Sequence, residues 1–122
     1  MESNWQQEDA VAQNTSEQLK ELNGRFAALA KAVPQAFASF RGLMTEATKE
    51  GALSGKFKEL IAVAIAVEKG CGDCILFHVA NAKKHGATRG ELSEALVVCI
   101  EMGGGPGAVY AARALAAYDD LG

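Results

Sequence analysis

The sequence has few aromatic residues, only two prolines and three cysteines, and each scarcity narrows the class of protein. Aromatic residues make up 7% of the 122 residues, and the only prolines are Pro34 and Pro106. Long helices are therefore favoured over a strand-rich fold. Three cysteines, an odd number, argue against a disulfide-stapled secreted scaffold and favour redox or metal chemistry.

Concentrated charge and long apolar runs are also missing. The net charge is only −3, so no electrostatic footprint for nucleic acid or an anionic membrane is expected. The longest uninterrupted apolar run, Leu60–Val67, is far shorter than the ~20 residues of a membrane span. The N-terminus lacks the basic and then apolar segments of a signal peptide, so we expect a cytoplasmic protein.

Apolar residues make up 49% of the chain, and their spacing predicts helices. Residues 1–13 are polar and are expected to form an N-terminal arm, whereas residues 14–122 form one all-α domain of about six helices. Helices are expected over about residues 16–33, 34–49, 56–69, 71–85, 88–101 and 106–118. The third of these is expected to be buried nearly all round, because of its alanine, isoleucine and valine content.

Glycines and capping residues mark the expected helix ends. Gly70 ends one helical stretch, Gly86 follows the next as an expected left-handed C-terminal cap, and Thr88 with Glu91 forms a capping box. The segment Gly103–Gly107 is interpreted as a helix break rather than a phosphate-binding loop. It lacks both a following Lys-Ser/Thr pair and a preceding strand.

The segment Cys71-Gly-Asp-Cys74 is a CxxC motif at the start of the expected fourth helix. Residues three apart on a helix are neighbours, so the two sulfurs are close enough for a disulfide. The N-terminal end of a helix also stabilises a thiolate. The motif therefore predicts a thiol that is reactive near neutral pH, whereas Asp73 points away and takes a solvent or capping role.

His78 and one acidic residue are expected to complete this site on an antiparallel helix pair. At 100° per residue, the side chains of Cys71, Cys74 and His78 fall within about 60° of one another. Because the chain must fold back after Gly70, Glu59 is expected roughly beside His78, where its carboxylate would orient the imidazole. Glu68, which lies nearer the bend, remains a rival for that position.

Other readings of these residues stay open from the pattern alone. A CxxC pair can be inert packing, or it can bind zinc, which needs a fourth ligand and normally a second close pair. Cys99 stands alone in an apolar stripe and is interpreted as a core residue. His85 ends a helix and is interpreted as structural. The phenylalanines at positions 26, 37, 40 and 57 are expected in the core or at a subunit interface.

Taken together, these segments resemble the AhpD-like, carboxymuconolactone decarboxylase superfamily. The resemblance covers roughly residues 30–118 and includes Glu59, the step of twelve residues to Cys71, the CxxC motif and His78. The matching segments are Lys58–Ala64, Gly70–His78, Ala80–Glu91 and Met102–Ala111.

The resemblance implies an all-α fold, a homo-oligomer of three or six subunits, and peroxiredoxin-like alkylhydroperoxidase activity. The position matching Cys74 would attack a small hydroperoxide, and Cys71 would resolve the product as a redox-active disulfide. A dithiol electron donor would then reduce this disulfide. Glu59 and His78 would relay protons, with no metal and no bound cofactor. The well-studied peroxidase has histidine where this chain has Asp73, which implies a shorter relay and weaker peroxidase activity.

Two rival functions remain. One is the lactone decarboxylation for which the superfamily is named, although its decarboxylase members lack the CxxC motif that is present here. The other is a non-catalytic oligomeric scaffold, with thiols that titrate near the ordinary value of ~8.5. Apolar helix surface in excess of what a small bundle covers supports an oligomer, with the third helix and residues 102–110 as candidate interfaces.

Overall fold

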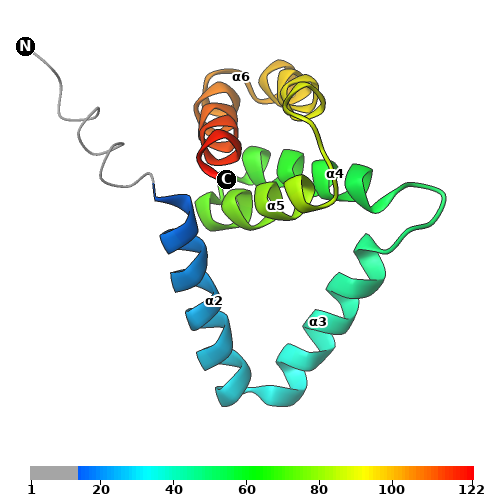
Figure 1. Cartoon of the computed structure of the whole chain (residues 1–122), viewed down its shortest axis with the longest axis vertical. Coiled ribbons are helices and arrows are strands. Elements are labelled where there is room, and N and C mark those ends of the chain that lie inside the picture. Colours follow the sequence, from blue (N-terminus) through cyan, green and yellow to red (C-terminus); the bar gives the residue numbers. More distant parts are fainter. Residues whose placement is uncertain (1–13) are drawn as a thin grey trace, which may run out of the picture.

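Five helices make up the part of the chain that the computed structural model describes, residues 14–122 (Figure 1). No strand occurs among these residues, so the prediction of an all-α domain is confirmed. The predicted N-terminal arm, residues 1–13, lies outside the described residues. In chain order the helices are α2 (Thr15–Ala32), α3 (Pro34–Thr48), α4 (Gly55–Lys69), α5 (Gly72–Lys84) and α6 (Arg89–Asp120).

The helices divide into a packed body and a splayed hairpin (Figure 1). Helices α4, α5 and α6 enclose the core, which contains Val63, Ile75, Val79, Leu92 and Ala114. Helices α2 and α3 lead away from this body and meet at Val33, so that α2 contacts α5 and α3 returns to α4. The body therefore carries most of the apolar burial, and the hairpin adds a second layer beside it.

Aromatic side chains fill the junction of the hairpin with α5. Phe26 of α2 lies 5.7 Å from Phe37 of α3 and 6.1 Å from Phe77 of α5, measured between ring centroids. Such tilted and edge-to-face pairs contribute a modest stabilisation beyond that of the apolar surface that they bury. Phe37 is buried, as expected for a core residue. Phe40 and Phe57 are about half exposed, so a place for them at a subunit interface stays a prediction.

The turn between α4 and α5 is very short, and this determines where the site lies. Gly70 takes a left-handed conformation with φ 67° and caps α4. The Cys71 N–H then donates to the carbonyl of Ala66 at 3.1 Å, which closes the turn. Helix α5 therefore begins at the end of α4 and runs back along it, as expected for an antiparallel pair.

The helix break predicted at Gly103–Gly107 is confirmed, although the two helices on either side of it are joined into one element, α6, so that residues 14–122 contain five elements instead of about six. Helix α6 bends sharply inside this break, at Gly104, whose φ and ψ are 63° and −140°. A glycine adopts this backbone conformation without steric cost, so one residue replaces the expected loop. Pro106 follows two residues later, in the first turn of the second half, where a missing N–H costs least. The capping box of Thr88 and Glu91 at the start of α6 is present as predicted.

Helix α4 is exposed along one face, which corrects the expectation that it is buried nearly all round. Phe57, Ile61 and Ile65 are each about half exposed, whereas Val63 and Val67 are buried. Residues at i, i+4 and i+8 share one helix face, so these three form a continuous apolar stripe. The single chain buries only one side of α4, because α5 and α6 pack on the same side.

Helix α6 is the one described helix that is long and apolar enough to cross a membrane, by length and composition alone. Its sharp bend at Gly104 and its packing against α4 and α5 are features of a helix in a folded bundle. The absence of a membrane partner stays a prediction.

Candidate active site

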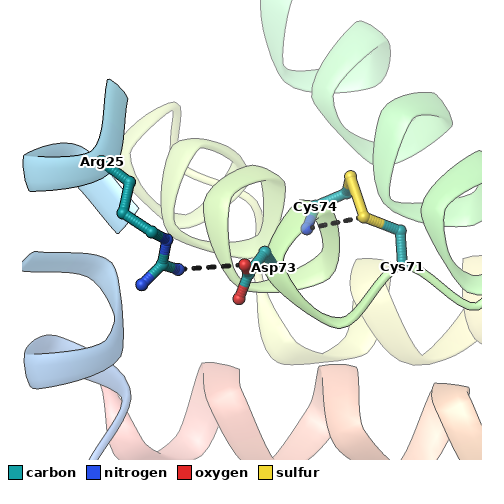
Figure 2. The surroundings of a disulfide bond; sticks show 4 residues. All are labelled: Arg25, Cys71, Asp73 and Cys74. Atoms are coloured by element: carbon teal, nitrogen blue, oxygen red, sulfur yellow. Dashed lines mark hydrogen bonds and ion pairs between the residues drawn. A yellow bond between two sulfur atoms is a disulfide. The ribbon is translucent and has the colours of Figure 1, made fainter. Parts of the chain in front are cut away.

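The CxxC cysteines form a disulfide at the start of α5, with their Cα atoms 5.2 Å apart (Figure 2). Cys71 is the N-cap residue of α5, and its Sγ accepts a hydrogen bond from the Cys74 N–H at 3.2 Å. Cys74 lies in the first turn and is exposed, whereas Cys71 is half-buried. The disulfide is therefore at a helix N-terminus that solvent and small molecules reach.

Glu59 and His78 meet across the two antiparallel helices. The His78 Nδ1 lies 2.9 Å from the Glu59 Oε2, and the Glu59 side chain is only 3% exposed. When the carboxylate is ionised, Nδ1–H is the donor and Nε2 remains available for proton exchange. A buried carboxylate needs such a partner, because an unpaired charge in the interior is costly.

Glu68, the rival carboxylate, lies elsewhere. A methyl group built on Gly103 would come within 2.7 Å of the Glu68 Oε1, so this side chain faces the bend of α6. Of the two acidic residues that the spacing left open, Glu59 is therefore the one that contacts His78. The catalytic role of the pair remains a prediction.

The imidazole and the disulfide are not hydrogen-bonded to each other in this oxidised form. No hydrogen bond joins His78 to Cys71 or Cys74 within residues 14–122, and the imidazole turns toward α4. His78 lies one helical turn beyond Cys74, which places the two on neighbouring parts of one face. Cys71, Cys74 and His78 thus share one helix face, as predicted. The imidazole of His78, however, is oriented by its hydrogen bond to Glu59.

A pocket of about 410 Å³ opens beside the Glu59–His78 pair, between α3, α4 and α5. Apolar walls come from Met44 of α3 and from Ile61 and Ile65 of α4. Sequence reasoning missed the contribution of α3, because an apolar residue such as Met44 at helical spacing is typical of core packing. The other lining residues are Thr45, Ala47, Thr48, Lys58, Ala62 and Asn81.

Asp73, between the two cysteines, forms an ion pair with a residue of α2, a contact that the sequence motifs did not predict. Its carboxylate accepts from Arg25 of α2 at 3.1 Å, and both side chains are more than half exposed. Figure 2 shows Asp73 pointing away from the sulfurs toward Arg25, on the other side of α5. Asp73 points away from the cysteines, as expected. Its partner Arg25 could not be predicted from local sequence, because it lies 48 residues away along the chain.

Cys99 and His85 take structural positions. Cys99 is 2% exposed, and burial, followed by the nearby charge of Glu68, raises the pKa of its thiol. His85 follows the last turn of α5, where its Nδ1 lies 2.8 Å from the Asn81 carbonyl oxygen. Within residues 14–122 no three His, Cys, Asp or Glu side chains gather as metal ligands, and the absence of a metal stays a prediction.

A protein family model and two curated relatives match this chain. The model of the carboxymuconolactone decarboxylase family matches residues 32–117. An uncharacterised protein of Cupriavidus necator is 55% identical over 103 residues, which cover 84% of this chain and 91% of the relative. A Paracoccus denitrificans protein, described as uncharacterised protein 4 in the cox locus, is 39% identical over 83 residues, or 68% of this chain and 75% of its own length.

A solved structure extends the agreement to three dimensions. The crystal structure of an apo carboxymuconolactone decarboxylase family protein from Legionella pneumophila matches with a TM-score of 0.86 at 43% identity. The match covers 90% of this chain and 98% of that one. The helices that hold the CxxC motif and the Glu59–His78 pair lie inside the region matched by the family model. This chain belongs to the carboxymuconolactone decarboxylase family.

Proposed function

We propose that the protein is a thiol-dependent peroxidase that reduces small organic hydroperoxides through the Cys71–Cys74 pair. The observation that carries the proposal is the accessible CxxC disulfide one helical turn from the buried Glu59–His78 pair. Cysteine pairs at helix N-termini are typical of thiol–disulfide chemistry, because the helix dipole favours the thiolate.

In the first step the thiolate of Cys74 attacks the terminal oxygen of a hydroperoxide ROOH. The O–O bond breaks, the leaving alkoxide takes a proton to give the alcohol ROH, and Cys74 is oxidised to a sulfenic acid. Cys74 is the better candidate for attack because it is the more exposed of the two cysteines. Cys71 is close enough to be the resolving thiol.

In the second step Cys71 displaces water from the sulfenic acid. A sulfur–sulfur bond forms between Cys71 and Cys74, the S–OH bond breaks, and the thiol proton leaves with the hydroxide as water. A dithiol donor then reduces the disulfide by two successive exchange reactions and is itself oxidised to a disulfide. Each cycle consumes one ROOH and one dithiol, and it releases ROH, water and one oxidised donor.

Glu59 and His78 would move the protons that this cycle requires. Glu59 holds the Nδ1 side of the imidazole, so Nε2 would take the proton of Cys74 before attack and return one to the leaving alkoxide. The adjacent pocket, with apolar walls from α3 and α4, would take the organic part of the hydroperoxide. The position between the cysteines holds Asp73 instead of the histidine of the well-studied peroxidase. We therefore expect a shorter proton relay and modest peroxidase activity.

The test is peroxide consumption by the reduced protein, followed by mass spectrometry of the oxidised product. We expect tert-butyl hydroperoxide to produce a Cys71–Cys74 disulfide that dithiothreitol reverses. Cys74→Ser should abolish consumption, and Cys71→Ser should allow one turnover and accumulate a sulfenic acid on Cys74. Cys99→Ser is the matched control and should keep the activity, because Cys99 is buried away from this site. Full activity of both CxxC variants would overturn the proposal.

A decarboxylase is the second candidate, and the pocket is the observation that favours it. Lys58, Glu59 and His78 line one cavity and include a cation and a possible proton donor. The Lys58 Nζ already donates to the Lys49 carbonyl at 2.7 Å, which weakens this reading. A variant lacking both Cys71 and Cys74 distinguishes the two functions, since turnover of a carboxymuconolactone by that variant would establish the decarboxylase.

We further propose that the protein is a cytoplasmic homo-oligomer of three or six subunits that acts without nucleic acid or membrane. The exposed side chains of Phe57 on α4 and Met102 on α6, neither of which lines the pocket, support the oligomer, because large exposed apolar residues are typical of interaction surfaces. The scaffold hypothesis predicts an oligomer as well, but with no reversible disulfide. The same mass-spectrometric experiment therefore separates the enzyme from the scaffold.

A further inference from the structure

Arg113 of α6 lies against the backbone of the CxxC motif, in a position that neither spacing nor motif indicated. A methyl group built on Gly72 would lie 3.3 Å from both terminal nitrogens of Arg113 and 3.5 Å from the carbon between them. Gly72 directly follows Cys71 and is the first residue of α5. The guanidinium therefore covers the first turn of the helix that bears both sulfurs.

Tyr110 lies one helical turn before Arg113 on α6. Its ring packs against Gly70, at the start of the connection between α4 and α5. A methyl group built on Gly70 would come within 3.2 Å of the Tyr110 ring. The Arg113 guanidinium carbon is 6.0 Å from the centroid of that ring, within reach of a cation–π contact. The second half of α6 thus presents an aromatic ring and a cation to the short segment from Gly70 to Gly72.

Some charged side chains near the CxxC motif form ion pairs with residues of opposite charge, and others do not. Asp73 is paired with Arg25 of α2, so this carboxylate and this cation largely cancel. Glu68, at the end of α4, faces Gly103, and Lys69 follows it in the last turn. By contrast, no carboxylate of residues 14–122 forms an ion pair with Arg113. His78, one turn beyond Cys74, is engaged by Glu59.

We propose that Arg113, which forms no ion pair within residues 14–122, is a positioning residue whose charge stabilises the thiolate of the reduced CxxC pair. The charge acts at the same end of α5 as the helix dipole, so the two effects add. The space beside Gly72 is nearly filled by the guanidinium, since a methyl group at this position would require Arg113 to move by a few tenths of an ångström. The inference rests on the proposed redox function and adds to it a residue that increases the thiolate fraction of the pair at neutral pH.

The expected size of the effect follows from one charge at a solvent-accessible site. A unit charge near a solvent-accessible thiolate, in surroundings between protein and water, shifts the pKa of the thiol by about half a unit. Arg113→Gln should therefore raise the apparent pKa of the more acidic thiol by about half a unit. The thiolate fraction near neutral pH should fall roughly threefold, and the alkylation rate with it.

The experiment measures alkylation of the fully reduced full-length protein with iodoacetamide at a series of pH values. Mass spectrometry of the peptides then assigns a separate pKa to Cys71 and to Cys74. Arg113→Lys, which keeps the charge, should retain most of the wild-type acidity. Arg89→Gln is the matched control and should leave both values unchanged. It removes the same charge from the same helix, but it lies beyond the opposite end of α5.

The outcomes separate this inference from the proposed function. If both wild-type thiols titrate at the ordinary value of ~8.5 or above, the thiolate-based peroxidase mechanism fails. If one wild-type thiol is acidic but Arg113→Gln behaves like Arg89→Gln, only the role of Arg113 is overturned. A rise in the Arg113→Gln variant that Arg113→Lys reverses supports the proposal. Arg113 is exposed, so an unchanged far-ultraviolet circular dichroism spectrum is expected throughout.

Discussion

Glu59 is a buried carboxylate whose one described partner is His78, and this pairing yields the first prediction at the residue scale. Glu59→Gln keeps the shape and a hydrogen bond to the imidazole but removes the negative charge that orients Nδ1–H. We expect the rate of peroxide consumption to fall about 100-fold, the lower range for loss of general acid–base catalysis. The measurement is initial rate against hydroperoxide concentration, with the dithiol donor in excess.

Glu68→Gln is the matched control for this prediction. Glu68 is exposed, lies on the same helix and faces Gly103 rather than His78. Its replacement should leave the rate within about twofold of the wild type, as is usual for a surface position away from the reacting groups. Equal losses in the two variants would show that charge on α4, and not the pairing with His78, is what the reaction requires.

Asp73 supplies a second prediction at this scale, opposite in sign to that for Arg113. Asp73→Asn removes a negative charge beside the cysteines and leaves Arg25 without its carboxylate. The pKa of the more acidic thiol should fall by about half a unit, since the local field becomes more positive. Stability should change by no more than about 1 kcal/mol, because exposed ion pairs contribute little. Alkylation against pH and urea unfolding measure the two effects, and a rise in the thiol pKa would contradict the argument.

At the scale of elements, the sharp bend of α6 depends on how closely its two halves approach. A methyl group at Gly107 would lie 2.6 Å from the carbonyl oxygen of Cys99, a backbone atom that yields little. Gly107→Ala should therefore lower the free energy of unfolding by about 1–3 kcal/mol, the usual cost of overpacking. Gly90→Ala, in the first turn of the same helix, meets nothing closer than 3.9 Å. It should raise stability by about 0.5–1 kcal/mol, because alanine favours the helix.

Urea unfolding of both variants tests this account of the bend. The two substitutions add the same methyl group to the same helix, so a difference in sign isolates the contact with Cys99. Similar effects in both variants would mean that α6 rearranges freely around Gly104, and that the close approach is not what determines its course.

Helix α2 is attached at its first residue to the end of α6, and this contact predicts a dependence on pH. The Thr15 N–H donates to the Asp120 Oδ2 at 2.7 Å, and this hydrogen bond lowers the pKa of Asp120. A lowered pKa means that the stabilisation is present above the ordinary value of about 3.9 and is lost as the pH falls through the value in the folded protein. The contact therefore contributes at neutral pH and disappears in acid.

Asp120→Ala should lower the urea midpoint at pH 7, with a smaller difference from the wild type near pH 2.5. Glu94→Ala, which removes an exposed acidic side chain elsewhere on α6, is the control and should show a weaker effect at pH 7. A difference between Asp120→Ala and the wild type that is as large in acid as at neutral pH would mean that the charge of Asp120 is not what holds α2.

At the scale of the whole molecule, the exposed apolar residues predict self-association. Phe57 on α4 and Met102 on α6 are 53% and 71% exposed, and neither lines the pocket beside His78. Phe57→Glu and Met102→Glu should each shift the protein toward the monomer in analytical ultracentrifugation, because a charge is costly in an apolar interface. Gln35→Glu adds the same charge at an exposed polar position and should leave the oligomer intact. A wild-type chain that sediments as a monomer would end this proposal.

The local features of the protein were predictable because they depend on neighbours in sequence. The capping box at Thr88, the end of α4 at Gly70 and the start of α5 at Cys71 all follow from residues within one helical turn. The approach of Glu59 to His78 was also within reach, since a very short turn leaves two helices little choice but to run antiparallel. Spacing alone, however, ranked Glu59 only slightly above Glu68.

What the amino-acid order determined by itself was the all-α class, the positions of most helix ends and the CxxC pair in one helical turn. Tertiary packing alone decided which face of α4 is buried, how α3 borders the pocket, and which arginines approach Gly72 and Asp73. The physical reason is distance along the chain. Caps and helical neighbours act within four residues, whereas Arg25 and Arg113 reach the motif across 48 and 41 residues through the packing of whole helices.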